Sequence, residues 1–263
     1  MTTSISLYIA GESGLHRLHP ITKLLLAVTL ILGGFTIPIP WASYAIFLGI
    51  ILPISVWGGI WKPMVLRVWK IVLPFAISIF LIQGLFWGTG PVLFYIGPLS
   101  VETEGILYAF ASVGRILLVI SSFLLLSMTT RPDFLMNALN KLGLPGAITY
   151  IIVTTIQIIP RFQEKAASII DAQRSRGLST EGNLLQRARA LTPLVLPLVL
   201  SSLLDVEERA IAIEARAFNS PGQKTSLIDL IDTQYQRIAR YILLVIITLM
   251  IGFRLWLLFQ PTS

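Results

Sequence analysis

The sequence has no cysteine and few charged residues. Asp, Glu, Lys and Arg together make up 13% of its 263 residues, whereas hydrophobic residues make up 55%. Without Cys there are no disulfides, thiolate metal sites or cysteine nucleophiles. Soluble domains carry about 25% charged residues, and the stretch from Leu24 to Trp61 carries none. This charge-free stretch predicts a protein that lies in a membrane.

Signatures of catalysis and of metal binding are also missing. The sequence has no GxxxxGK[ST], GxSxG or HExxH pattern, so the residues that hydrolytic chemistry would need are absent. Its two histidines, His16 and His19, are three residues apart, and we predict polar residues near lipid headgroups instead of a metal site. The formal net charge of +7 is explained by basic residues on one side of the membrane, so no nucleic-acid partner is predicted.

Five segments are apolar and long enough, or nearly so, to cross a hydrocarbon core of about 30 Å. They are roughly residues 24–39, 41–58, 70–87, 105–127 and 239–259. Pro38 and Pro40 separate the first two, which predicts a tight helical hairpin. The fold class is therefore predicted to be all-α: a polytopic membrane protein with about five transmembrane helices plus long amphipathic cytoplasmic helices.

The distribution of charge predicts the orientation. Lys62, Arg67 and Lys70 stand among tryptophans before the third span, whereas the loop at 87–105 carries only acidic charge. Because basic loops stay in the cytoplasm, the N-terminus is predicted inside and the C-terminus outside. Arg115 falls within the fourth span, where a charge is costly, so we place it in the interior of the bundle.

Two further apolar segments, 142–160 and 191–204, are predicted not to cross the membrane. If both crossed, the basic residues between them would lie outside, against the positive-inside rule. Pro145, Pro160, Pro193 and Pro197 also interrupt these segments. We therefore predict helices packed at the inner face, and three regions: membrane helices at 1–141, inner-face and cytoplasmic helices at 142–238, and a last span at 239–263.

A short motif occurs twice in the cytoplasmic region. DAQRSRGL at 171–178 and AIEARAF at 212–218 share an Ala, two variable residues, a small residue, an Arg, and then Gly or Ala. Small residues allow a partner backbone to approach, and Arg presents a rigid, permanently charged fork. The motif residues are Ala172, Ser175, Arg176 and Gly177 in the first copy, and Ala212, Ala215, Arg216 and Ala217 in the second. Arg174 is a possible addition, and the helix carrying the first copy is predicted to run uninterrupted from Arg161 to Gly177.

Four stretches together resemble a known family. They are LHRLHPITKLLLA at 15–27, TTRPDFLMNALNKLGLP at 129–145, IIPRFQEKAASIIDAQRSRGL at 158–178, and the EARAF ending of the second motif. In combination they are similar to the transmembrane T subunit (EcfT, CbiQ-like permease) of energy-coupling factor transporters, ABC-type importers of vitamins or transition-metal ions. The resemblance extends almost from end to end.

The resemblance implies a non-catalytic scaffold in the inner membrane of the cell. Two ABC ATPase subunits would bind ATP and Mg, the unequal motifs favouring two non-identical chains, and this chain would bind no cofactor. A separate substrate-binding membrane S subunit would be a further partner, besides the lipid bilayer. The family's coupling arginines correspond to Arg176 and Arg216, and Ala217 replaces the glycine of the family pattern.

Two other classes of function compete with this hypothesis. An autonomous secondary transporter or channel would use Arg115 along its pathway, but the spans lack paired acidic residues. A membrane-bound enzyme of lipid metabolism would need a converging cluster of acidic residues or histidines at the inner face. Transport without any ATPase would favour the first of these over the scaffold.

Overall fold

The computed structural model describes residues 8–9, 11, 13–86, 91–96, 99–177, 184–218, 220 and 232–259. Its contacts divide the chain into two compact units. One unit holds the described residues of Pro145–Leu227, and the other holds those of Ser6–Leu144 and Ile228–Ser263. Below, the second is called the membrane unit and the first the two-helix unit.

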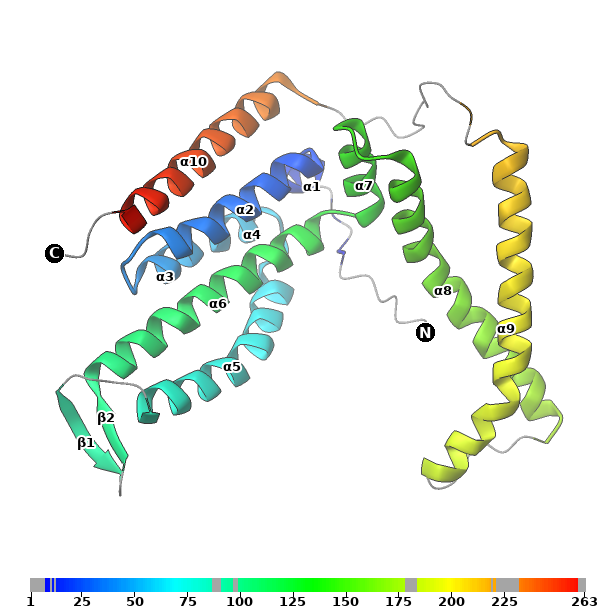
Figure 1. Ribbon diagram of the computed structural model, residues 1–263, viewed down its shortest axis with the longest axis horizontal. Helices are drawn as coiled ribbons and strands as arrows, with labels where there is room; N and C mark the ends of the chain where they lie inside the picture. The colour runs from blue at the N-terminus through cyan, green and yellow to red at the C-terminus, as the bar shows by residue number, and fades with distance from the viewer. Residues whose placement is uncertain are drawn as a thin grey trace. The chain divides into compact units, whose positions relative to one another are not determined.

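The membrane unit is almost entirely helical (Figure 1). A short α1 precedes α2, and α3 continues through a π-helical turn, Phe47–Ile51, into α4. The strands β1 and β2 form an antiparallel hairpin between α5 and α6, with Ile96 paired to Leu99. The bounds are α1 Gly14–Arg17, α2 Pro20–Thr36, α3 Ala42–Ile46, α4 Leu52–Trp57, α5 Trp61–Phe86, β1 Val92–Ile96, β2 Leu99–Glu102, α6 Thr103–Thr129, α7 Pro132–Lys141 and α10 Gln234–Phe259.

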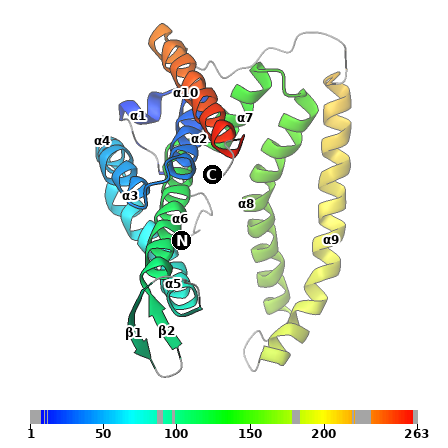
Figure 2. The ribbon, with the colours of Figure 1, turned by 60° about the vertical axis from the view of Figure 1, so that its left-hand side comes forward.

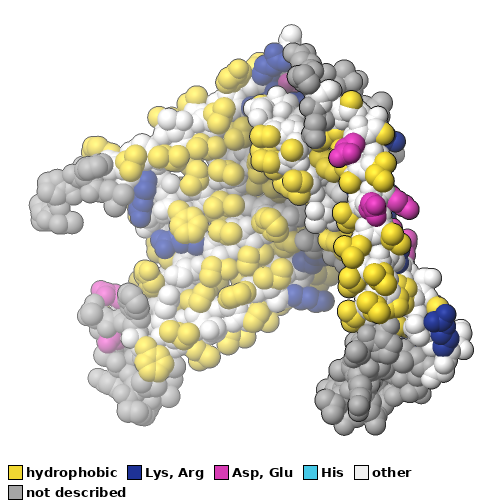
Figure 3. Space-filling view, turned by 45° about the vertical axis from the view of Figure 1, so that its right-hand side comes forward, with side chains coloured by type: hydrophobic (Ala, Val, Ile, Leu, Met, Phe, Trp, Pro, Cys, Tyr) yellow, Lys and Arg dark blue, Asp and Glu magenta, His cyan; other side chains and the backbone are white. Residues whose placement is uncertain are grey.

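Among the described residues, three helices are long and apolar enough to cross a membrane: Trp61–Gly84, Thr103–Thr129 and Gln234–Trp256. Two further apolar helices, Pro20–Thr36 and Ala42–Trp57, are shorter; 17 residues in α2 span only about 26 Å. Many large hydrophobic side chains on these helices are exposed, and they spread over the surface in Figure 3. The prediction of an all-α polytopic membrane protein is confirmed, with a small β-hairpin added in the predicted outer loop.

The core of the membrane unit lies along α5 and α6, where Met64, Val68 and Leu118 are buried. Glycines bring neighbouring helices close to α6. A Cβ on Gly34 of α2 would collide with Leu118, and one on Gly114 would lie 2.7 Å from the Tyr44 ring. Close approach of this kind is typical of helix packing in membranes.

Arg115 follows the buried Gly114 on α6 and is itself half-buried. We expected it in the interior of the bundle. Its side chain is neither fully buried nor exposed within the membrane unit.

The two-helix unit consists of α8, Gly146–Ser175, and α9, Leu184–Ala215. The helices are antiparallel (Figure 2). The Tyr150 ring near the start of α8 lies 5.1 Å from the ring of Phe218, just beyond the end of α9. Farther along, Nζ of Lys165 donates to the backbone oxygen of Ser201 at 3.2 Å and pairs with Asp205.

The predicted break at Pro145 is confirmed, because Pro145 is the N-cap of α8, but the breaks predicted at Pro160, Pro193 and Pro197 are wrong. Pro160 lies inside α8, and α9 continues through positions 193 and 197. Residues 146–160 and 191–204 are therefore parts of two long helices, not separate short ones. A proline removes one intrahelical hydrogen bond, and the rest of a 30-residue helix such as α8 keeps its own.

Candidate functional site

The first arginine motif lies where α8 ends. The helix stops at Ser175, Arg176 is the C-cap residue, and Gly177 has a φ of +92°. The backbone N–H of Gly177 donates to the oxygen of Arg174 at 2.9 Å. The predicted continuous helix to Gly177 therefore ends two residues early, because a glycine in the left-handed region reverses the chain after the C-cap.

The second motif ends α9 in the same way. The helix stops at Ala215, and Ala217 has a φ of +51°. Its N–H donates to the Glu214 oxygen at 2.9 Å, and that of Phe218 donates to the Ile213 oxygen at 3.2 Å. These two bonds define a Schellman ending. The two motifs therefore share a backbone geometry as well as a sequence pattern, with an Arg one residue before the left-handed position.

Ala217 is unusual among the described helix ends of this type. The same pair of bonds closes α4 and α7, where the left-handed residues are Gly59 and Gly143. A side chain in this region costs about 1 kcal/mol or more relative to Gly. The second motif therefore retains a small backbone strain that the first motif lacks.

Replacing Ala217 with Gly is expected to raise the free energy of unfolding by about 1 kcal/mol. Thermal unfolding of the detergent-solubilised protein measures it. Gly177→Ala is the reciprocal variant, and a Cβ at this position would meet no atom within 4 Å. We therefore expect the free energy of unfolding to fall by about 1 kcal/mol, because of the positive φ alone. An Ala217→Gly variant that is less stable than wild type would contradict this assignment.

All the predicted motif residues are exposed. They are Ala172, Arg174, Ser175, Arg176, Gly177, Ala212, Ala215, Arg216 and Ala217. Arg174 lies 3.6 Å from Asp171 on the same helix. Because α8 and α9 are antiparallel and 30 and 32 residues long, their C-terminal ends lie at opposite ends of the pair, about 45 Å apart at 1.5 Å per residue.

Each motif can present a cation beside a helix C-terminus. The last carbonyls of a helix carry partial negative charge, which favours Lys or Arg there. A guanidinium can bind a carboxylate through two parallel hydrogen bonds. Arg176 and Arg216 are thus suited to reach acidic groups on another protein.

The structure contains a second polar cluster, around Lys23 at one end of the membrane unit. Lys23 in the first turn of α2 is only 5% exposed. Its Nζ donates to the oxygen of Thr129 at 2.8 Å and to that of His16 at 3.2 Å. Thr129 ends α6, so Lys23 joins the start of one helix to the end of another. The residues of this cluster fall in two of the family-like stretches, 15–27 and 129–145, but the sequence did not show that these stretches meet.

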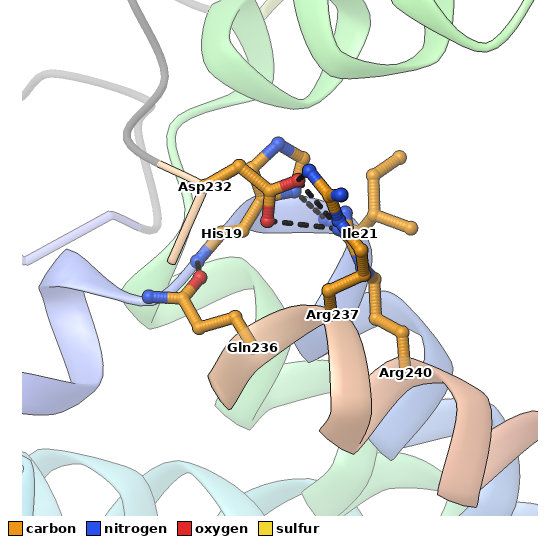
Figure 4. Close-up of polar contacts among 6 residues, drawn as sticks. All are labelled: His19, Ile21, Asp232, Gln236, Arg237 and Arg240. Atoms are coloured by element: carbon orange, nitrogen blue, oxygen red, sulfur yellow. Dashed lines mark hydrogen bonds and ion pairs between the residues drawn. The ribbon is translucent and has the colours of Figure 1, made fainter. Parts of the chain in front are cut away.

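A further set of contacts joins α10 to the start of α2 (Figure 4). The Gln236 side-chain oxygen accepts from the backbone N–H of His19 at 2.8 Å. Asp232 accepts two bonds from Arg240, at 2.8 and 2.7 Å, and the hydrogen bonds from Arg240 lower the pKa of Asp232 below its usual value. The Gln236 bond attaches the last helix to the start of α2, and the bonds of Arg240 hold Asp232 against α10.

Histidine protonation is expected to weaken this end of the membrane unit. Burial, followed by the charge of Arg240, lowers the pKa of His19 below 6.5, and burial also lowers that of His16. The neutral form is thus favoured in the folded protein. The resulting stability is fully present above pH 6.5 and is lost as the pH falls through the lowered pKa, because the unfolded chain takes up protons first.

We therefore expect the unfolding temperature to decrease between pH 7.5 and pH 5. In α2, Nδ1 of His19 accepts from the Ile21 N–H at 3.3 Å, as an N-cap. His19→Asn keeps a capping oxygen and removes the titrating group. This variant should show a smaller decrease with pH, and an unchanged decrease would exclude His19 as a contributor.

The described geometry defines a polytopic helical membrane protein with paired, exposed arginine motifs. The family model described as cobalt transport protein, CbiQ, matches residues 11–227. The chain belongs to this family.

The chain is also similar to curated proteins named energy-coupling factor transporter transmembrane protein EcfT. It is 30% identical over 238 residues to the one from Thermosediminibacter oceani, covering 85% of this chain and 87% of the relative. The relative from Brevibacillus brevis is 31% identical over 242 residues, covering 85% and 88%. The relative from Clostridium kluyveri is 28% identical over 266 residues, covering 96% and 97%.

Proposed function

We propose that this protein is the transmembrane scaffold and energy-coupling subunit of an energy-coupling factor importer for a vitamin or a transition-metal ion. The observation that carries the proposal is the pair of exposed arginine motifs with one helix-ending geometry, at Arg176 and Arg216. The family membership of the chain and its similarity to proteins named EcfT support the proposal. In this proposal the chain catalyses nothing itself.

Two ABC ATPase subunits would each bind one motif. They would bind ATP and Mg, and their closure would move the C-terminal ends of α8 and α9 relative to each other. Long helices suit this role because they transmit displacement along their axes. Lys165, bonded to Ser201 and Asp205, couples the two helices near the middle of the pair.

The other expected partner is a substrate-binding membrane S subunit that receives this movement. Exposed hydrophobic residues of α9, such as Leu196, Leu200 and Leu203, suit a partner in an apolar environment. The difference between Gly177 and Ala217 supports two non-identical ATPase chains, one for each motif. The proposed location is the inner membrane, with the N-terminus and both motifs in the cytoplasm, following the basic residues.

Co-purification combined with uptake tests the proposal. The chain would be expressed with and without candidate ABC ATPase subunits, purified in mild detergent and reconstituted with a candidate S subunit. We expect both ATPases to co-purify and uptake to require ATP. Uptake by the chain in the absence of ATPases would contradict the proposal and support an autonomous transporter, for which Arg115 is the residue to test.

A further inference from the structure

A cavity of about 250 Å³ lies at the end of the membrane unit that carries Lys23. It is formed where the start of α2 meets the junction of α6 and α7. The residues lining it are Tyr8, His16, Arg17, Leu18, His19, Pro20, Lys23, Thr129, Thr130, Arg131 and Phe134. The motif residues of α8 and α9 take no part in it.

Three cationic side chains line this cavity, and no described acidic side chain does. Lys23 is buried and uses two of its three ammonium protons on the backbone oxygens of His16 and Thr129. Arg17 is exposed and has no ion-pair partner among the described residues. Arg131 pairs with Asp133 at 2.8 Å, which lies outside the lining. The cavity therefore has an excess of positive charge.

Hydrogen-bond donors accompany these charges. Arg131 is the N-cap of α7, a ten-residue helix, and gives no side-chain bond to its first turn. The first N–H groups of a helix lack intrahelical acceptors and favour an anion; in α7 they begin at Asp133, because Pro132 has no N–H. Thr130, 6% exposed, has a hydroxyl without any hydrogen-bond partner, which is uncommon for a buried polar group. Cations and unpaired donors together suit an oxyanion.

The position of the cavity indicates where that anion comes from. Thr129 is the last residue of the α6 span, and Pro20 begins α2. The cavity thus lies where apolar helices end, at the level at which lipid headgroups meet a membrane protein. Its volume is sufficient for a phosphate group with its neighbouring atoms.

We propose that this cavity binds a phosphate-bearing anion at the membrane surface, with Lys23, Arg17 and Arg131 as its cations. An anionic phospholipid headgroup and free inorganic phosphate share this chemistry, and the level of the cavity favours the lipid. If Lys23 served only to cap the end of α6, there would be no reason for Arg17 and the N-terminus of α7 to face the same cavity. The bound headgroup would hold the α6–α7 junction against the start of α2.

Lipid binding by the purified full-length chain tests this proposal. Short-chain phosphatidylglycerol, phosphatidylcholine and inorganic phosphate would be titrated separately, with binding followed by native mass spectrometry. Arg17→Gln with Arg131→Gln alters the cavity. Lys62→Gln with Lys70→Gln removes the same charge from exposed positions of α5 and is the matched control.

Wild type should bind phosphatidylglycerol at least about tenfold more tightly than phosphatidylcholine, because the cavity cations attract a headgroup with net negative charge. The cavity variant should lose this preference, and the control variant should keep it. If millimolar inorganic phosphate displaces phosphatidylglycerol, free phosphate is also an occupant of the cavity. If it does not displace the lipid, the lipid headgroup alone is the occupant. Equal preference in the wild type and the cavity variant, or equal loss in the control, would overturn the proposal.

Discussion

Reversing the charge of both motif arginines is expected to abolish ATP-driven uptake. In Arg176→Glu with Arg216→Glu, each acidic group that the proposed coupling role pairs with a guanidinium would instead face a carboxylate. Truncating one partner of such a pair costs about 2–5 kcal/mol, so each single reversal should weaken ATPase binding by about thirtyfold or more. The double variant should retain no measurable complex.

The two arginines are exposed, so the variant chain should still fold. Each contributes a favourable helix-end interaction of only about 0.3–1 kcal/mol. Arg161→Glu is the matched control, because Arg161 is an exposed arginine of the same helix, α8, outside the motif. ATPase co-purification and uptake would be measured side by side. Normal uptake by the double variant, or equal loss in the control, would contradict the coupling role.

Replacing Lys23 with Met is expected to be the most destabilising single change considered. It leaves the backbone oxygens of His16 and Thr129 without the donor that now bonds to both. A buried acceptor without a partner costs about 1–3 kcal/mol, so we expect a loss of about 3 kcal/mol in the free energy of unfolding. The chain would be followed by thermal unfolding in detergent.

Lys62→Met is the matched control for this change. Lys62 is exposed on α5 and lies 5.6 Å from the centre of the Trp61 ring. Its replacement should change the free energy of unfolding by less than about 1 kcal/mol. If both variants unfolded at the wild-type temperature, Lys23 would not be the bridge between α2 and α6.

Hydrophobic content and the placement of charge were enough to predict helices that cross a membrane. The third, fourth and last predicted spans correspond to α5, α6 and α10. The first two predicted spans, 24–39 and 41–58, correspond to the shorter apolar helices Pro20–Thr36 and Ala42–Trp57, and α2 has only 17 residues. Such runs are readable because hydrocarbon allows few structures other than a helix whose backbone bonds are all internal.

Proline was a misleading signal. Pro160 was expected to end a helix, yet it lies inside α8. The local preference against proline amounts to a few kcal/mol, which the remaining hydrogen bonds of a long helix and its packing can exceed. In contrast, Gly177 and Ala217 do end their helices. The repeated motif was visible in the sequence, but its position at the reversal of the chain was not.

By itself, the sequence determined the membrane environment and the presence of two arginine motifs. These are properties of composition and of local spacing. Only the tertiary structure decided that the motif ends lie at opposite ends of an antiparallel pair, and that Lys23 bonds to Thr129, 106 residues later. Side chains so far apart in sequence meet only after the helices pack, because nothing in the local pattern specifies which helix ends come together.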